Sequence, residues 1–163
     1  MLAQVAAPAS AIRAHEEMFA YWASLRSAGR LPARADIDPG RFKRHLPTVS
    51  LIDVIRGEKL DFRIRLAGTA LYGLHSREIT GLTVVEAYGP RDAPYWTSEL
   101  EKVVTTARPA AGLRPLPGRD SDALSVMWLR LPLASNGAEV DMILGYDAVI
   151  GDPRYAPTGI RAA

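Results

Sequence analysis

Residues 60–67, LDFRIRLA, alternate apolar and polar side chains along their whole length. One side of the alternation carries Leu60, Phe62, Ile64 and Leu66, whereas charged residues occupy the other. A period of two is typical of a β-strand with one buried face. Residues 48–55 keep this period but are apolar on both faces, and residues 56–59 form a polar turn between the two segments. The sequence therefore predicts an antiparallel hairpin.

Helical signals flank the hairpin on both sides. Met18, Tyr21, Trp22 and Leu25 recur at helical spacing and predict a helix over residues 10–28. An Asp-Pro pair at residues 38–39 starts a short second helix that Pro47 ends. After the hairpin, we expect short helical pieces over residues 69–90, the first of them capped by Thr69, and a longer helix over residues 92–107, capped by Asp92.

The last third of the chain returns to strand patterns. Residues 112–116, 123–134 and 139–150 are predicted strands, and Ser135-Asn136-Gly137 is a strong hairpin signal between the last two. Two strands followed by three, with helices between them, predict an antiparallel sheet. The expected fold class is α+β, a five-stranded sheet with helices on one face and an extra N-terminal helix.

Composition narrows the class of protein. A length of 163 residues is typical of about one domain. The 20 Lys and Arg residues against 18 Asp and Glu residues give a net charge of +2, which is too small to predict nucleic-acid binding. No apolar run is long enough for a membrane-spanning helix, so we expect a cytoplasmic protein without membrane contact. The chain has no cysteine, which excludes disulfides and thiolate metal sites. His15, His45 and His75 lack metal-binding spacing, and no metal site is predicted.

Four segments carry a longer pattern: YWASLRSAGRLPARADIDP at 21–39, LIDV at 51–54, FRIRLAGTALYGLHSREITG at 62–81 and LRLPLASNG at 129–137. In this order they resemble the motifs of an alphaproteobacterial PAS-type family. The resemblance covers about residues 15–150, and it departs from the family at Ser76 and Tyr88, where Gly and Trp are usual.

The resemblance also divides the chain into segments. It implies a PAS core at residues 48–150, preceded by an N-terminal helical segment at residues 10–47. The ends, at residues 1–9 and 151–163, lack periodicity and are expected to be flexible.

PAS domains bind small molecules between sheet and helices, so the resemblance implies a cavity there. The candidates for its lining are His75 and the apolar residues of the predicted inner faces: Ile64, Leu66, Leu74, Trp96, Leu100, Val104, Met127, Leu129, Leu144 and Tyr146. Plain core packing is the alternative role for each apolar candidate. If a ligand binds, Met127 and Tyr146 are its adaptable and hydrogen-bonding contacts.

A second set of residues is expected to shape the loops after the hairpin. Its members are Arg65, Gly68, Thr69, Glu78, Thr80 and Gly81. Gly68 and Thr69 suit a tight strand exit and a helix cap, and Thr80 and Gly81 suit a turn with a positive φ. Arg65 is a candidate to hold the loop around Glu78 by a charge-assisted hydrogen bond.

The resemblance implies a signalling or regulatory PAS protein. With no effector motif in the chain, we expect it to act in trans on a protein partner, and Met18, Tyr21, Trp22 and Leu25 are the candidate interface of a homodimer or a partner complex. Packing of this helix on its own sheet is the alternative. A second hypothesis is a sensor whose cavity holds a small apolar or aromatic molecule.

Cofactor and enzyme hypotheses find little support. Without cysteine, a cysteine-adduct flavin is excluded, and a haem is not expected because residues 92–107 contain no histidine. Any cofactor is unknown. Phosphate-binding and nucleophile motifs are absent, so no enzyme is predicted. Catalysis would require Glu78, His75 and Tyr146 to converge on one site.

Overall fold

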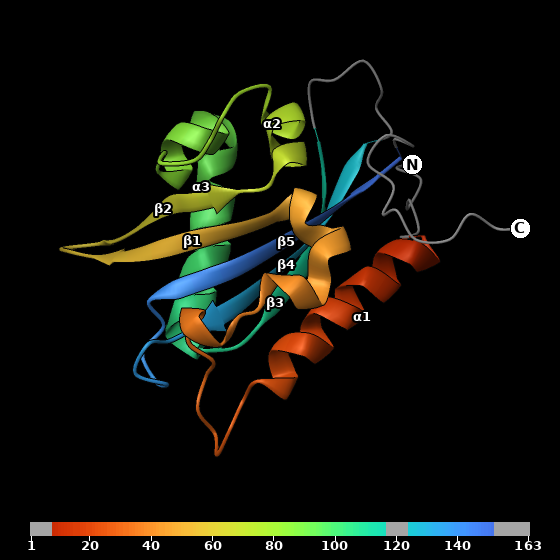
Figure 1. Cartoon of the computed structure of the whole chain (residues 1–163). Helices are drawn as coiled ribbons and strands as arrows, with labels where there is room; N and C mark the ends of the chain where they lie inside the picture. The colour runs from red at the N-terminus through yellow and green to blue at the C-terminus, as the bar shows by residue number, and fades with distance from the viewer. Residues whose placement is uncertain (1–7, 117–123, 152–163) are drawn as a thin grey trace, which may run out of the picture.

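The computed structural model describes residues 8–116 and 124–151 of the chain. Its five strands are β1 (Val49–Arg56), β2 (Leu60–Ala67), β3 (Ala110–Pro115), β4 (Ser125–Leu133) and β5 (Met142–Ile150). They form one antiparallel sheet in the order β2-β1-β5-β4-β3 (Figure 1). The predicted fold class and the first hairpin are confirmed. The expected flexible ends, apart from residues 8, 9 and 151, lie outside the described residues.

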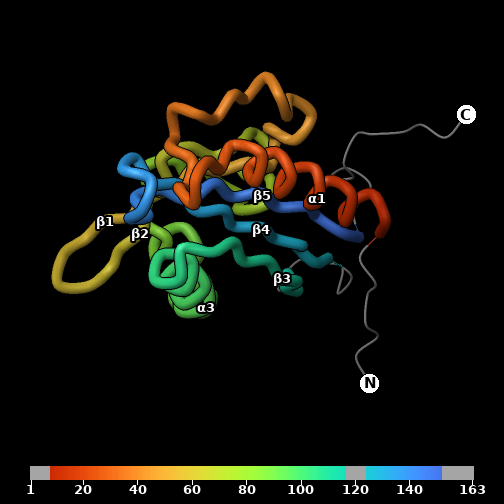
Figure 2. The backbone as a smooth tube through the Cα atoms, turned by 90° about the horizontal axis from the view of Figure 1, so that it is seen from below, coloured from red at the N-terminus to blue at the C-terminus, as the bar shows by residue number. Residues whose placement is uncertain are grey.

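The central strands β4 and β5 are buried on both faces, so the sheet needs a cover on each side. Figure 2 shows α1 (Ala9–Ser24) on one face and α3 (Val84–Thr106) on the other. The short helix α2 (Thr69–His75) follows β2, and two 3₁₀ segments, η1 (Arg34–Asp36) and η2 (Pro39–Thr48), join α1 to β1. No helix within the described ranges is long and apolar enough to span a membrane.

The N-terminal helix α1 packs on the sheet of its own chain. Met18 and Trp22 are fully buried in the main core, and the Trp22 indole Nε1 donates to the Pro132 carbonyl oxygen at 2.8 Å. Tyr21 and Leu25 are partly buried against the same core. The expectation that these four residues face a partner is therefore corrected: the apolar α1 face covers the apolar face of β4 and β5.

A β-bulge changes the predicted alternation in β2. Leu66 pairs with Leu51 but Ile64 pairs with Ile52, so Arg65 is an extra residue in the ladder. The extra residue turns Leu66 to the face opposite Ile64, and its side chain is 45% exposed while Ile64 is buried. Leu66 is therefore not an inward-facing residue, contrary to the alternation of the sequence.

Helix α3 begins earlier than the sequence predicts. Thr83 and Glu86 form a capping box at its start, instead of the expected cap at Asp92. Gly89 is non-helical, with a φ of +73° and a ψ of 174°, so the Gly-Pro signal at residues 89–90 marks a sharp kink where two helical pieces of α3 meet.

Gly68 makes the tight exit from β2 that the sequence predicts. A Cβ at this position would lie 2.2 Å from the carbonyl oxygen of Leu46 and 2.4 Å from that of Pro47. Both are rigid backbone atoms, so only glycine fits where η2 crosses the start of α2. Thr69 is the first residue of α2 and makes no capping hydrogen bond, so its expected capping role is corrected.

Candidate functional site

A cavity of about 210 Å³ lies between α2, α3 and strands β3 to β5. Its lining residues are Leu74, His75, Ala87, Tyr88, Asp92, Trp96, Arg114, Pro115, Leu116, Val126 and Asp147. A designed cavity of about 150 Å³ in another protein admits benzene, so this one has room for a planar ring with substituents. Three residues expected from the sequence are among the lining: Leu74, His75 and Trp96.

The other cavity candidates lie elsewhere. Tyr146 packs edge-on against His15 of α1 and His45 of η2, which places it on the opposite face of the sheet. Met127, Leu129 and Leu144 share that face by strand alternation and register. Their expected place beside Trp96 is corrected, because a strand buried on both faces gives no sign of which face meets which helix.

The remaining candidates belong to the packed core or to its margin. Leu100 is fully buried in the main core, and Ile64 lies in a smaller cluster with Leu71, Ile79 and Ala87. Val104 is partly buried against the main core. None of the three is among the side chains that line this cavity.

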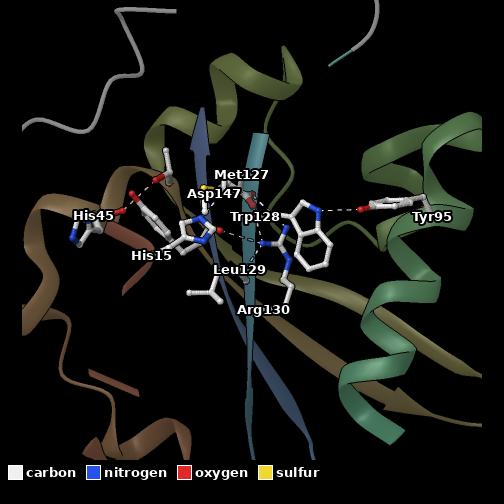
Figure 3. Close-up of polar contacts among 10 residues, drawn as sticks. His15, His45, Tyr95, Met127, Trp128, Leu129, Arg130 and Asp147 are labelled. Atoms are coloured by element: carbon white, nitrogen blue, oxygen red, sulfur yellow. Dashed lines mark hydrogen bonds and ion pairs between the residues drawn. The ribbon is translucent and has the colours of Figure 1, made fainter. Parts of the chain in front are cut away.

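The lining residue Asp147 belongs to a buried ion pair. The Arg130 guanidinium Nη1 donates to the Asp147 carboxylate at 2.8 Å, and Nη2 approaches its second oxygen at 3.4 Å (Figure 3). Arg130 is 1% exposed and Asp147 is 3% exposed. The guanidinium lies 5.0 Å from the Trp96 ring and 5.8 Å from the Trp128 ring. Burial opposes the charge of Arg130, but the Asp147 carboxylate and the Tyr88 hydroxyl together outweigh it and raise the pKa of Arg130.

Two glycines make room for these large side chains. A Cβ at Gly145 would lie 2.3 Å from the Ser50 hydroxyl and 3.3 Å from Arg130 Nη1. A Cβ at Gly112 would lie 2.6 Å from the Trp128 ring. The pair of Arg130 and Asp147 was not found from the sequence; a charged residue inside each apolar strand was the only signal of it.

Aromatic side chains line the cavity beside the ion pair. His75 meets Tyr88 edge-on with ring centroids 4.9 Å apart, and Tyr88 stacks on Trp96 at 5.0 Å. Burial raises the pKa of Tyr88 to about 12, although its hydroxyl is hydrogen-bonded to Arg130. Burial lowers the pKa of His75, whose ring is hydrogen-bonded to the Ala87 backbone. The site therefore holds a neutral phenol and a neutral imidazole at neutral pH.

A second ion pair lies at the partly exposed edge of the cavity. Arg114 Nη2 of β3 donates to the Asp92 carboxylate of α3 at 2.7 Å, and its guanidinium lies 3.9 Å from the Tyr95 ring centroid. The Tyr95 hydroxyl accepts a hydrogen bond from Trp128 Nε1 at 3.0 Å. These contacts tie α3 to β3 and β4, so the helix and the sheet wall of the cavity are held together.

The family model described as "PAS domain" matches residues 11–147. The chain belongs to the PAS domain family. Proteins of this family are sensory or regulatory modules as a class and typically not catalysts. No curated protein matches the chain.

Solved structures are similar to this PAS domain at low identity. The LOV protein of Rhodobacter sphaeroides is 11% identical over 74% of this chain and 73% of its own, with a TM-score of 0.49. The light-state Aureochrome1 LOV photoreceptor is 13% identical over 68% of this chain and 86% of its own, with a TM-score of 0.48. A sensory box sensor histidine kinase from Vibrio cholerae is 10% identical over 66% and 85%, with a TM-score of 0.46.

The opposite face of the PAS domain carries its own polar cluster under α1. His15 Nε2 is hydrogen-bonded to the Met127 carbonyl oxygen at 2.8 Å, and His45 Nε2 lies 3.0 Å from the Glu17 carboxylate. Glu78 is exposed and bonded to its own loop. Tyr146 lies across the sheet from His75, so these groups do not converge as a catalytic site would require. Among the described residues, no three His, Asp or Glu side chains form a metal-binding group.

The loop after α2 has the expected turn but a different anchor. Gly81 has a φ of +86°, and the Glu78 carboxylate accepts from the Thr80 backbone N–H at 2.9 Å. Arg65 does not reach this loop, because its Nε donates to Asp53 at 2.8 Å. Arg63 takes that role by donating to the Gly81 carbonyl oxygen at 2.8 Å, and the expectation for Arg65 is corrected.

We predict that the PAS domain loses stability as the pH falls from about 7.5 to about 5.5. Burial lowers the pKa of both His15 and His75 below the ordinary value of 6.5. As the pH falls through about 6.5, these two histidines therefore bind protons in the unfolded chain but stay neutral in the folded chain. The free energy of unfolding then decreases by at most about 1.4 kcal/mol per pH unit for each histidine.

Urea denaturation at several pH values measures this slope. His75→Phe should flatten it, because one of the two titrating groups is removed. A wild-type stability that stays constant or rises over this pH interval would show that the two imidazoles are not held neutral by burial.

Proposed function

We propose that this PAS domain is a signalling or regulatory sensor that binds a small molecule in the cavity between α2, α3 and the sheet. The observation that carries the proposal is a cavity of about 210 Å³ with a buried charged side chain, Asp147, in its wall. The walls of this cavity come from two helices and three strands, so a molecule bound there would contact both layers of the domain.

The residues that line the cavity have the chemistry of a ligand pocket. Ligand pockets are mostly apolar with a few polar groups that fix orientation. Here Leu74, Trp96 and Val126 supply apolar surface, and His75 and Asp147 supply polar atoms. The buried ion pair of Arg130 and Asp147 is costly to desolvate and adds little stability by itself, so its place beside the cavity supports a role in binding.

A ligand-observed NMR screen of small planar compounds tests this proposal. Val126→Phe fills part of the cavity from β4 and should abolish the binding of most hits. Val104→Phe makes the same change outside the cavity lining and should leave binding unchanged. If Val126→Phe binds every hit as the wild type does, the cavity is not the binding site.

We infer further that the output passes to a protein partner in trans, including a second copy of the chain, through the outer face of α1. This face is separate from the buried stripe of Met18 and Trp22. It presents two large apolar side chains, Ile12 at 41% and Phe19 at 46% exposure. They are seven residues apart, which places them on one side of the helix.

Replacing Phe19 with glutamate tests the α1 surface in a homodimer. A charge at this position should shift the sedimentation coefficient of a wild-type dimer towards that of the monomer, because it would be desolvated in the interface. Val85→Glu, an equally exposed apolar position on α3, is the matched control. A wild-type chain that sediments as a monomer at high concentration would contradict the homodimer and leave only a different protein as the partner.

A further inference from the structure

Asp147 has unused capacity to accept hydrogen bonds where it lines the cavity. Two ionised carboxylate oxygens offer about four lone-pair sites. The Arg130 guanidinium fills one well at 2.8 Å and a second weakly at 3.4 Å. The carboxylate is 3% exposed and forms part of the cavity wall, so its remaining lone pairs are available to a molecule inside the cavity. A carboxylate that is buried and only partly satisfied is a strong acceptor for N–H donors.

Arg130, the positive partner of the Asp147 carboxylate, does not line the cavity. Its guanidinium lies 5.0 Å from the Trp96 ring and 5.8 Å from the Trp128 ring. Figure 3 shows Arg130 between Asp147 and Trp128. An anion that entered the cavity would meet the negative oxygens of Asp147 before it reached Arg130. Arg114, the cation of the lining, lies at the partly exposed edge of the cavity, where its charge is paired with the Asp92 carboxylate at 2.7 Å and its guanidinium lies on the Tyr95 ring.

The imidazole of His75, like the carboxylate of Asp147, offers a hydrogen-bond acceptor to the cavity. Its pKa is lowered by burial, so it is neutral near pH 7, and one ring nitrogen is engaged with the Ala87 backbone. In a neutral ring that donates to a carbonyl oxygen, the other nitrogen is an acceptor. Asp147 and His75 therefore offer hydrogen-bond acceptors to the cavity, and the aromatic walls of Tyr88 and Trp96 suit a flat ligand.

We propose that the cavity selects a planar ligand with paired N–H donors, of the amidine or amino-heteroaromatic class, held by the carboxylate of Asp147, and that it disfavours carboxylates and phosphates. Two parallel N–H groups match the two oxygens of a carboxylate, as in an Arg–carboxylate fork. This inference rests on the proposed function, because it specifies the ligand class for the same cavity.

Benzamidine and benzoate are matched probes for the proposal. They share one ring and a planar group of equal size, but benzamidine donates N–H bonds and is cationic, whereas benzoate accepts and is anionic. Isothermal titration of the wild-type chain with each probe at about pH 7.5 should show benzamidine binding at least about tenfold more tightly, a difference of roughly 1.4 kcal/mol. The preference should disappear in the double variant Arg130→Met with Asp147→Leu, which removes the buried pair without leaving a lone charge.

Asp53→Asn is the control for net charge, because it removes a partly exposed carboxylate that is paired with Arg65 and does not line the cavity, and it should keep the preference. Equal or tighter binding of benzoate would overturn the inference and leave the sensor function intact. The inference also fails if neither probe binds while the compound screen finds cavity ligands of another class. A screen that finds no cavity ligand at all refutes the proposed function itself.

Discussion

Replacing Asp147 with asparagine is expected to lower the free energy of unfolding of this PAS domain by about 3–5 kcal/mol. The substitution removes the negative partner of Arg130, whose side chain is 1% exposed. Arg130 cannot lose its proton within the ordinary pH range, so its charge stays buried without compensation. Urea denaturation of the two proteins measures the difference.

Two further variants separate this effect from a general loss of charge. Asp53→Asn removes a carboxylate from an exposed pair with Arg65 and should change stability by about 0–1 kcal/mol. Arg130→Met combined with Asp147→Leu should recover most of the loss, because apolar side chains of similar size replace a buried pair at little cost. An Asp147→Asn protein as stable as the Asp53→Asn protein would show that water reaches the pair.

Truncating Trp22 to alanine should lower the free energy of unfolding by about 3–5 kcal/mol, the usual cost for a large buried aromatic residue. The indole is fully buried between α1 and the sheet and donates to the Pro132 carbonyl oxygen at 2.8 Å. The substitution leaves a cavity and an unpaired carbonyl together. Thermal and urea denaturation both report the loss.

Phe19→Ala is the control on the same helix. Phe19 neighbours Trp22 with ring centroids 5.9 Å apart but is about half exposed, so its truncation should change stability by no more than about 0.5 kcal/mol. If Trp22→Ala were as mild as Phe19→Ala, α1 would not be docked on its own sheet in solution, and its apolar face would be free for a partner.

The sheet could be predicted because its strands carry local signals. The alternation of residues 60–67 and the Ser-Asn-Gly turn at residues 135–137 each depend on neighbouring residues, and both hairpins are present in the structure. Within β2, the prediction that Leu66 faces inward was wrong, because the β-bulge depends on pairing with β1. Such a register shift leaves no mark on the periodicity of β2 itself.

The site could be predicted only in part, because it depends on which face of the sheet each helix covers. β4 and β5 are apolar on both faces, so the sequence does not distinguish the side of Val126 and Asp147 from that of Met127 and Tyr146. Leu74, His75 and Trp96 were found because they lie on helices whose inner face is marked by its apolar stripe. The contact between Arg130 and Asp147 depends on the β4–β5 register, which no local pattern reveals.

The three tryptophans allow the most direct test of the central claim, that a small molecule binds on the α3 face of the sheet. Trp96 lines the cavity, Trp128 packs edge-on against it at 5.6 Å, and Trp22 lies under α1 on the other face. The measurement is the ¹⁵N–¹H spectrum of the indole N–H groups during titration with the hits of the compound screen. The account predicts that the Trp96 signal moves with ligand concentration, that Trp128 follows it, and that Trp22 stays in place. Hits that move only the Trp22 signal, or that saturate without moving Trp96, would contradict it.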